Sequence, residues 1–472
     1  MRFVVFINGV TLIFAAGLMA LTALFFRDEA GIFGMSGLLT GALGLLLAFA
    51  TRGSGADLRR EQAFLLTSTV WLTAALAGAA PLFIWSMSFV DALFESMSGI
   101  TTTGSTVLTG LDHAPRGVLF WRALLQCLGG VGFVVTGIAL LPFLKVGGMQ
   151  LFRTESSDKG EKELDTAAEL AGATLLIYLG LLLACMLAYR AGGMSFFDAI
   201  THAMTTVSTG GYANYDASFG HFESAGLQWT ATLFMLLGAT PFVWYIRIYN
   251  RRTFRSEQVR MMLWTLAIAS TSIAAWLVAT EEIAPLDALR LAAFNVVSVV
   301  TTTGFATADY TLWGPFAVAG FLVLTAMGGC TGSTSGGAKF MRWIIIARAA
   351  AVQARRIRMP HLVLSVRYEG RRVQPDVLSG VISFFTFYIG TFALLSFALA
   401  LTGMDNWSAI SGALTALANV GPGIGDVIGP AGNFTSLGDG SKLLLVFGMF
   451  VGRLEMLTVY VLFTTVYWRE AF

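Results

Sequence analysis

Two stretches of the chain place three threonines and a glycine directly after an apolar segment. The sequence TTTG ends at Gly104 in one stretch and at Gly304 in the other. Threonine hydroxyl and main-chain carbonyl oxygens can replace the water shell of a cation, and glycine permits the backbone angles that align such carbonyls. The pattern therefore predicts a cation site made of loop oxygens, without a nucleophile, an acid or a base.

A related unit occurs four times along the chain. Each copy begins with a polar or acidic residue or close to one, continues through a short apolar segment, and ends in a polar loop with glycine. The four copies are SFVDALFESMSGITTTGST (88–106), SFFDAITHAMTTVSTGGYA (195–213), APLDALRLAAFNVVSVVTTTGFA (284–306) and DNWSAISGALTALANVGPGIG (405–425). One such loop alone is equally well explained as a polar turn between helices. Internal repetition outweighs any single motif, and it favours a shared role for the four loops.

The composition is that of a membrane protein. Of 472 residues, 56% are hydrophobic and 12% are charged, and the mean hydropathy is +0.72, whereas soluble domains average about 25% charged residues. Apolar stretches of about 20 residues recur, and each is long enough to cross a bilayer as a helix. We therefore expect an all-α polytopic membrane protein with about ten transmembrane helices. The expected spans are 4–26, 31–50, 63–86, 117–143, 166–189, 225–247, 259–280, 313–350 (interrupted), 377–402 and 441–466.

Motifs of enzymes and metal proteins are missing from the sequence. Cys127, Cys185 and Cys330 are scattered through apolar sequence, without the spacing of a disulfide framework or a metal site. The four histidines form no recognisable ligand set, and no Ser-His-Asp or dinucleotide-binding pattern occurs. The sequence does not favour an enzyme.

The four short apolar segments are too short to span a bilayer and are typical of re-entrant helices. Ser88 or Asp91 can cap the first helix, and Ser195 or Asp198 can cap the second. The carboxyl end of each short helix then points into the membrane, where four partial negative charges favour a cation. Non-helical backbone at this depth is tolerated where it is buried in protein or lines a cavity. We expect the four loops to surround one axis.

Most basic residues fall on one side of the expected membrane. Loops near 52–60, 145–162, 247–260 and 339–372, with the two termini, hold 23 of the 30 Lys and Arg residues. The positive-inside rule makes this side cytoplasmic, with both termini in the cytoplasm. Basic clusters also occur in nucleic-acid-binding proteins, but their position next to the membrane favours a topological role. We expect the lipid bilayer, and no nucleic acid, as a partner.

The combined features resemble the superfamily of K⁺ transporters that includes TrkH, TrkG and KtrB, and most closely its TrkH type. The resemblance rests on the loop motifs TTTGST, STGGYA, TTTGFATADY and NVGPGIG, and on the segments WRALLQCLGGVGFVVTGIALLPFL (121–144) and GGMQLFRTES (147–156). It implies two N-terminal helices followed by four membrane–pore-loop–membrane repeats around one central pore. The implied divisions are the N-terminal extension (1–51), repeat 1 (52–146), repeat 2 (147–250), repeat 3 (251–372) and repeat 4 (373–472).

The resemblance also implies a function. It indicates a K⁺-selective subunit of a bacterial K⁺ uptake system that conducts passively or through a gate. It further implies a homodimer in the bacterial inner membrane and a cytosolic, nucleotide-binding regulator of the TrkA type. K⁺ is the only ion implied, and no covalent cofactor is expected. Two alternatives stay open: a symporter that couples K⁺ to Na⁺ or H⁺, and an integral membrane enzyme that acts on a polar headgroup.

In this superfamily, the residues around each loop glycine form the selectivity filter that binds K⁺. The matching residues are Thr102, Thr103 and Gly104; Thr209, Gly210 and Gly211; Thr302, Thr303 and Gly304; and Asn419, Val420 and Gly421. In the second loop we favour Gly211 as the key glycine, with Gly210 as the alternative. Asp198 precedes Gly211 by 13 residues, which equals the spacing from Asp91 to Gly104.

A glycine-rich stretch, MGGCTGSTSGGAKFMR (327–342), interrupts the helix after the third loop. Each glycine costs a helix about 1 kcal/mol relative to alanine, so the helix is expected to unwind here. The resemblance implies an intramembrane gating loop over 327–338. Its gating residues are Gly328, Gly329, Gly332, Ser333, Thr334, Ser335, Gly336 and Gly337. The alternative is a close-packing surface of small residues; the spacing does not fit a phosphate-binding P-loop.

Arg453 lies in the middle of the last expected helix. A charge inside a membrane segment is costly and therefore suggests a function. The resemblance places Arg453 in the pore below the filter, where its positive charge limits cation occupancy. The alternative is a buried ion pair with Glu455 or another buried carboxylate. We favour this less because Arg453 and Glu455 are two residues apart and do not share a helical face.

Overall fold

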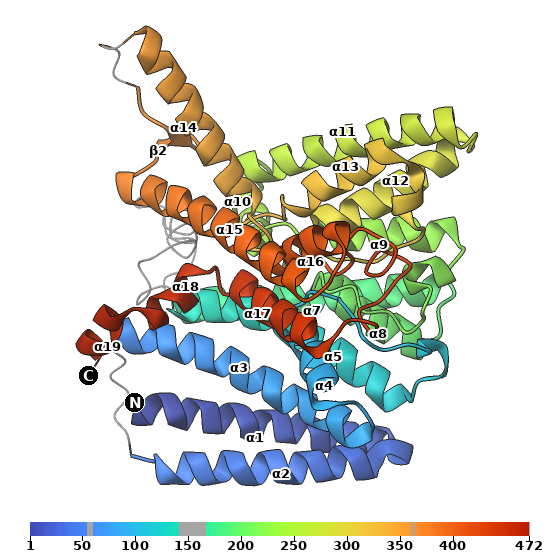
Figure 1. Cartoon of the computed structure of the whole chain (residues 1–472), viewed down its shortest axis with the longest axis vertical. Coiled ribbons are helices and arrows are strands. Elements are labelled where there is room, and N and C mark those ends of the chain that lie inside the picture. Colours follow the sequence, from blue (N-terminus) through green and yellow to red (C-terminus); the bar gives the residue numbers. More distant parts are fainter. Residues whose placement is uncertain (54–59, 141–166, 360, 362–363, 472) are drawn as a thin grey trace.

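The computed structural model describes residues 1–53, 60–140, 167–359, 361 and 364–471, and most of this part of the chain is helical (Figure 1). The long helices are α1 (Arg2–Phe25), α2 (Ala30–Ala50), α3 (Arg60–Trp85), α5 (Arg116–Leu140), α7 (Ala167–Ala191), α11 (Glu257–Thr280) and α15 (Pro375–Leu401). Four short helices are α4 (Phe89–Ile100), α8 (Phe196–Val207), α12 (Pro285–Val300) and α16 (Asn406–Ala418). The remaining main elements are α9 (Ala225–Gly238), α10 (Phe242–Arg251), α13 (Pro315–Thr325), α14 (Phe340–Arg358), β1 (Arg367–Tyr368), β2 (Arg371–Arg372), α17 (Asp439–Arg453), α18 (Leu457–Tyr460) and α19 (Thr465–Ala471).

The number of spans fits the expected architecture. Within the described residues, six helices are long and apolar enough to cross a membrane, and two bent pairs raise the number to eight. The other two expected crossings correspond to α5 and to the pair α13 and α14, which is interrupted as the glycine-rich sequence predicts. The prediction of an all-α, multi-span membrane protein is confirmed.

Two spans that the sequence suggested were continuous are broken. In the first, α9 and α10 meet at 86°, where Pro241 precedes α10 and lacks the N–H that a continuing helix needs. In the second, α17 and the segment that begins with α18 meet at 104°. Here Glu455 and Met456 have φ values of 61° and 28°, which are incompatible with a right-handed helix. Arg453 is therefore the last residue of α17 and does not lie within a continuous helix.

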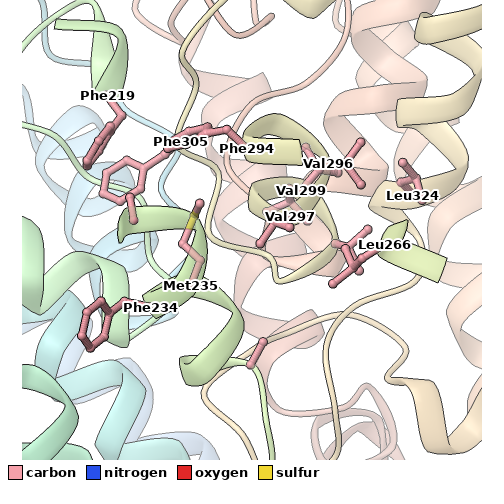
Figure 2. Packing of buried hydrophobic residues seen from close by; sticks show 14 of the residues in the cluster. Phe219, Phe234, Met235, Leu266, Phe294, Val296, Val297, Val299, Phe305 and Leu324 are labelled. Carbon is pink, nitrogen blue, oxygen red and sulfur yellow. The ribbon is translucent and has the colours of Figure 1, made fainter. Parts of the chain in front are cut away.

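Each of the four units has the same order of elements: a long helix, a short helix, a loop and a second helix or bent pair. The units begin with α3, α7, α11 and α15. Among the short helices, α12 is rich in valine, a β-branched residue that is a weak helix former. It is helical nevertheless, which we attribute to the membrane environment. In lipid every backbone group must be paired internally, and the helix is further buried by apolar neighbours. Figure 2 shows Val296, Val297 and Val299 of α12 within a cluster of buried hydrophobic residues.

Both marked ends of the chain and the β1–β2 hairpin lie toward the left of Figure 1, at the same side of the helical body. Beside α14, the antiparallel hairpin packs on an apolar cluster that includes Ile345 and Tyr368. Arg348 of α14 forms an ion pair with Glu257 at the start of α11 (2.6 Å). That this side is cytoplasmic stays a prediction.

Part of the predicted topology lies outside the described residues. This part includes the boundary between repeats 1 and 2 at 146–147 and the motif at 147–156. The basic residues affected are Arg59, Lys145, Arg153, Lys159 and Lys162. The division into an extension and four repeats follows the order of elements, but its boundaries stay predictions.

Candidate functional site

The short helices begin at well-defined caps. Ser88 accepts a hydrogen bond from the main-chain N–H of Asp91 (3.1 Å), and Ser195 accepts one from Asp198 (3.1 Å). The serines are therefore the N-caps, and the aspartates lie in the first turn. Asp405 caps α16, whereas α12 begins with a proline in its first turn. Each short helix ends at one of the four loops, which places its partial negative charge there.

The four loops share one backbone conformation. Two residues before the key glycine, a residue other than glycine has a left-handed φ: 55° at Thr102, 52° at Thr209, 59° at Thr302 and 55° at Asn419. The glycines themselves have φ values of 89° at Gly104, 76° at Gly211, 84° at Gly304 and 105° at Gly421. The structure thus aligns Gly211 with the glycines of the other loops, and Gly210 with the residue before them.

The main-chain hydrogen bonds repeat in the same way. In each loop, the N–H before the key glycine donates to the carbonyl five residues earlier. The four bonds are Thr103 to Ser98 (2.8 Å), Gly210 to Thr205 (2.8 Å), Thr303 to Ser298 (2.8 Å) and Val420 to Thr415 (3.1 Å). Such agreement over four loops with different side chains indicates that one backbone geometry is maintained by the fold.

The loops contact one another in a closed ring. A Cβ atom added to Gly104 would overlap the carbonyl oxygen of Gly210 in loop 2. Gly211 approaches the carbonyl of Thr303 in loop 3, and Gly304 approaches that of Val420 in loop 4. Gly421 completes the ring, because its Cβ would lie 2.9 Å from the Thr103 carbonyl. Every key glycine therefore combines a left-handed φ with a position that has no room for a side chain.

Side chains support the loops differently. In loop 1 the hydroxyls of Thr101 and Thr103 are 2.7 Å apart, and in loop 3 those of Thr301 and Thr303 are 2.8 Å apart. Asn419 of loop 4 donates to the Thr103 hydroxyl (3.0 Å) and to a carbonyl of α17. The fourth loop, whose sequence departs most from the others, is thus fixed by an amide instead of a hydroxyl pair.

A cavity of about 250 Å³ opens beside the ring. Its lining includes Gly104, Gly211 and Gly421, so three of the four loops reach it. Asp216 also lines the cavity, and its carboxylate accepts main-chain hydrogen bonds from Gly110 (2.9 Å) and the next residue. This carboxylate stabilises a turn while it adds negative charge to the cavity.

The glycine-rich stretch is an irregular loop between α13 and α14. Gly328 and Gly337 hold its two ends together, because a Cβ on either would overlap the backbone of the other. Hydrogen bonds from Lys339 to Met327 (2.9 Å) and from Phe340 to Gly329 (3.0 Å) close the same end. The predicted interruption of the helix is therefore correct; gating by this loop stays a prediction.

The intramembrane loop, 327–338, contacts the polar loops directly. The Ser335 hydroxyl donates to the Thr301 carbonyl (2.7 Å), and the Gly336 N–H donates to the Thr302 hydroxyl (2.8 Å). Thr334 donates to the carbonyl of Gly238 (3.0 Å) at the end of α9. The remaining predicted gating residues lie in the same buried stretch: Ser333 bonds the Cys330 carbonyl, and the Gly332 carbonyl accepts from Phe242.

Arg453 joins the same assembly. Its guanidinium donates to the Thr334 carbonyl (2.9 Å) and to the Gly129 carbonyl of α5 (3.1 Å). Glu455 is the ion-pair partner of Arg342 in α14, at 2.7 Å. The structure thus brings Arg453 to the intramembrane loop and Glu455 to α14.

Sequence analysis missed a polar group behind the first two loops. Arg122 of α5 forms an ion pair with Glu95 of α4 (2.7 Å), and both side chains are almost fully buried. Arg122 also donates to the Ala213 carbonyl (3.0 Å) and stacks on the ring of Tyr212. One helical turn along α5, Gln126 contacts loop 2. Arg122, an ionisable residue inside the expected span 117–143, was the available signal.

These features define a class of protein: a helical membrane protein in which four re-entrant helices bring oxygen-rich loops into one buried ring, as an ion-transport protein requires. The family is also clear. The chain belongs to the TrkH family of cation transport proteins, because the sequence model of this family matches residues 33–470. This is a family of transport proteins and not of enzymes.

Similarity to individual proteins extends over almost the whole chain. The Trk system potassium uptake protein TrkI of Halomonas elongata is 44% identical, over 94% of this chain and 91% of its own length. The Trk system potassium uptake protein TrkH of Escherichia coli K12 is 36% identical, over 98% of both chains. The crystal structure of the potassium transporter TrkH from Vibrio parahaemolyticus matches with a TM-score of 0.90 and 32% identity, over 99% of both chains.

Proposed function

We propose that this chain is the K⁺-conducting subunit of a K⁺ uptake system, with the four loops as its selectivity filter. The observation that carries the proposal is the closed ring of four loops with one shared backbone conformation. The proposed filter comprises residues 102–104, 209–211, 302–304 and 419–421. Relatives named as potassium uptake proteins support K⁺ as the ion.

The chemistry at the ring suits a cation. Four short helices direct their negative ends toward it, and carbonyl and hydroxyl oxygens can replace an ion's water. Among the described residues, Thr102 Oγ1 and Asn419 Oδ1 are buried oxygens without a hydrogen-bond partner. Burying an oxygen without a hydrogen-bond donor or a cation beside it costs free energy.

A gate below the filter is the second part of the proposal. The intramembrane loop bonds to the proposed filter residue Thr302 and to Arg453, and these contacts support a position across one end of the ring. In this position it would obstruct the ion path, and Arg453 would add a positive charge that opposes cations. Opening requires the loop to move away from Thr301 and Thr302, the residues to which it is hydrogen-bonded.

The proposal extends to the location and the partners of the chain. We propose a homodimer in the bacterial inner membrane, with both termini cytoplasmic and a cytosolic TrkA-type, nucleotide-binding regulator. The support for a bound regulator is the basic, protruding region of α14 and the β1–β2 hairpin on the side of the two termini. A regulator bound there would act on α14, which leads directly to the intramembrane loop.

The decisive experiment is ion flux into liposomes that contain only the purified chain. We expect K⁺ and Rb⁺ to permeate and Na⁺ and Li⁺ to be largely excluded. Equal flux of all four ions would contradict the filter. A reversal potential that follows K⁺ alone supports passive conduction, whereas a shift with Na⁺ or pH indicates the alternative symporter.

A further inference from the structure

The second loop lacks a side chain that loops 1 and 3 use. At the position before the key glycine, Thr103 and Thr303 place hydroxyls against threonines two residues earlier. Loop 2 has Gly210 at this position, so that support is absent from its sequence. Its key glycine, Gly211, nevertheless has the same left-handed φ as the others. Something outside the loop must restrict two consecutive glycines, which are the most flexible residues.

Gln126 of α5 occupies the missing space. A Cβ atom on Gly210 would overlap the Gln126 carboxamide. The buried Gln126 side chain donates from Nε2 to the Gly210 carbonyl (2.6 Å) and accepts at Oε1 from the Tyr212 N–H (3.0 Å). These two groups belong to the peptide units on either side of Gly211. The arrangement uses the donor and the acceptor of an amide at once, which neither a leucine nor a carboxylate can do.

The helix that carries Gln126 is itself fixed to loop 2. Arg122 lies one turn earlier on the same face of α5 and donates to the Ala213 carbonyl (3.0 Å). Its ion pair with Glu95 holds that arginine in place. α5 therefore contacts the stretch from Gly210 to Ala213 through two side chains one turn apart.

We propose that Gln126 is a positioning residue for ion selectivity, which supplies from repeat 1 the support that Gly210 cannot supply in repeat 2. This inference rests on the proposed role of the four loops as the filter. Without Gln126, the peptides around Gly211 lose both hydrogen bonds in a buried setting. They would then take other orientations and weaken the discrimination between ions.

The test is Gln126→Leu in the full chain, reconstituted in liposomes. We expect the K⁺/Na⁺ permeability ratio to fall by roughly tenfold, the scale set by two lost buried hydrogen bonds. Gln126→Glu keeps the size of the side chain but loses the donor, and it is expected to lower the ratio as well. This second variant makes the test independent of whether the leucine variant folds.

A rescue distinguishes positioning from general packing. The φ of Gly210 is not left-handed, so a threonine fits there once Gln126 is shortened. In sequence, Ser208 holds the position in loop 2 that Thr101 and Thr301 hold in loops 1 and 3. The double variant Gln126→Ala with Gly210→Thr is expected to have a higher ratio than Gln126→Ala alone. A merely structural role for Gln126 predicts no such recovery.

Two controls separate the possible failures. Asn8→Leu removes another buried amide, which bonds Thr69 (3.0 Å) and Thr73 (2.7 Å) away from the loops, and it should leave the ratio unchanged. Gly304→Ser reports on the filter itself. A lowered ratio in Gly304→Ser with an unchanged ratio in Gln126→Leu would overturn the role of Gln126 alone. Unchanged ratios in both would overturn the filter proposal as well.

Discussion

At the scale of single residues, the key glycines and Arg453 are under opposite constraints. Each key glycine of the ring has no room for a side chain, because both its φ and the adjacent carbonyl exclude one. Arg453, by contrast, brings a charge and several hydrogen-bond donors into a buried site. Substitutions at the two kinds of position should therefore alter different properties of transport.

Gly304→Ser should reduce K⁺/Na⁺ discrimination. The added side chain would overlap the Val420 carbonyl and strain a φ of 84°, at a cost on the order of 1–3 kcal/mol. We expect the permeability ratio to fall by about tenfold, which corresponds to 1.4 kcal/mol. The control is Gly193→Ser, which has a φ of 103° but open space around it. A similar loss of discrimination in both variants would contradict a local effect at the ring.

Arg453→Gln should raise the basal K⁺ flux and leave selectivity unchanged. Removing the charge lowers the electrostatic barrier to a cation, and a barrier of about 1 kcal/mol corresponds to roughly a fivefold change in flux. Arg453→Lys keeps the charge and should retain the low basal flux. Liposome flux measured without any regulator tests both variants. Equal flux in the two would show that charge at this position does not control conduction.

At the scale of elements, the intramembrane loop is closed at its base. The contact between Gly328 and Gly337 joins the ends of α13 and α14, while Ser335 and Gly336 contact the third loop of the ring. The loop can therefore change shape without a change in the helices that carry it. If the loop moves away from the ring, Thr301 and Thr302 lose these hydrogen bonds.

Deleting Gly332 to Gly336 should raise basal K⁺ flux and weaken its dependence on the regulator. The deletion removes the part of the loop that contacts the filter but keeps Gly328 and Gly337. Flux with and without the regulator, and the elution profile of the purified variant, provide the measurement. If the stretch only packs small residues together, expression and flux will fall in parallel. Wild-type basal flux and intact regulation in a folded variant would reject the gate.

At the scale of the whole molecule, polar contacts join consecutive units around the ring. Arg122 of the first unit bonds the second, and Arg290 of the third bonds Gln228 of the second. Lys442 of the fourth unit pairs with Asp91 of the first (2.6 Å), although the two are distant in sequence. This last pair connects the end of the chain to its first repeat.

Asp91→Asn should destabilise the protein more than Lys442→Met. The Lys442 side chain is only 6% exposed, and that of Asp91 is 28% exposed. Removing the aspartate leaves a buried charge without its partner, which costs about 3–5 kcal/mol, whereas removing the lysine leaves an aspartate that water reaches. Thermal unfolding in detergent should show the larger decrease for Asp91→Asn. The reverse order would contradict a stabilising pair.

Charge reversal at Arg371 and Arg372 should weaken binding of the regulator without preventing membrane insertion. Both residues lie in β2 and are exposed, and the hairpin adjoins α14, which leads to the intramembrane loop. Co-purification with the regulator is the measurement. Charge reversal at Arg251 and Arg252, at the end of α10, is the matched comparison. Full binding by the β2 variant would move the proposed contact to another basic loop.

Much of this organisation is predictable from sequence, for identifiable reasons. Repetition and hydropathy are local signals, so the spans, the four short helices and the interruption at 327–338 could be predicted. The breaks after α9 and α17 were not predicted, because Pro241 and the residues after Arg453 lie in sequence that is otherwise apolar enough to span. Contacts between units could not be predicted, because the spacing of residues along the sequence does not indicate them. Gln126 contacts Gly210 only because the fold brings α5 to loop 2.

The ring of four loops on one chain also has an evolutionary consequence. In an assembly of identical subunits, a mutation changes all symmetry-related positions together. Here each of the four loops is encoded separately, so the sequence of one loop can change while the other three loops keep the backbone of the ring in place. The different supports of loops 1, 2 and 4 fit such a history. A single gene of this kind can therefore change the ring in small steps, one position at a time.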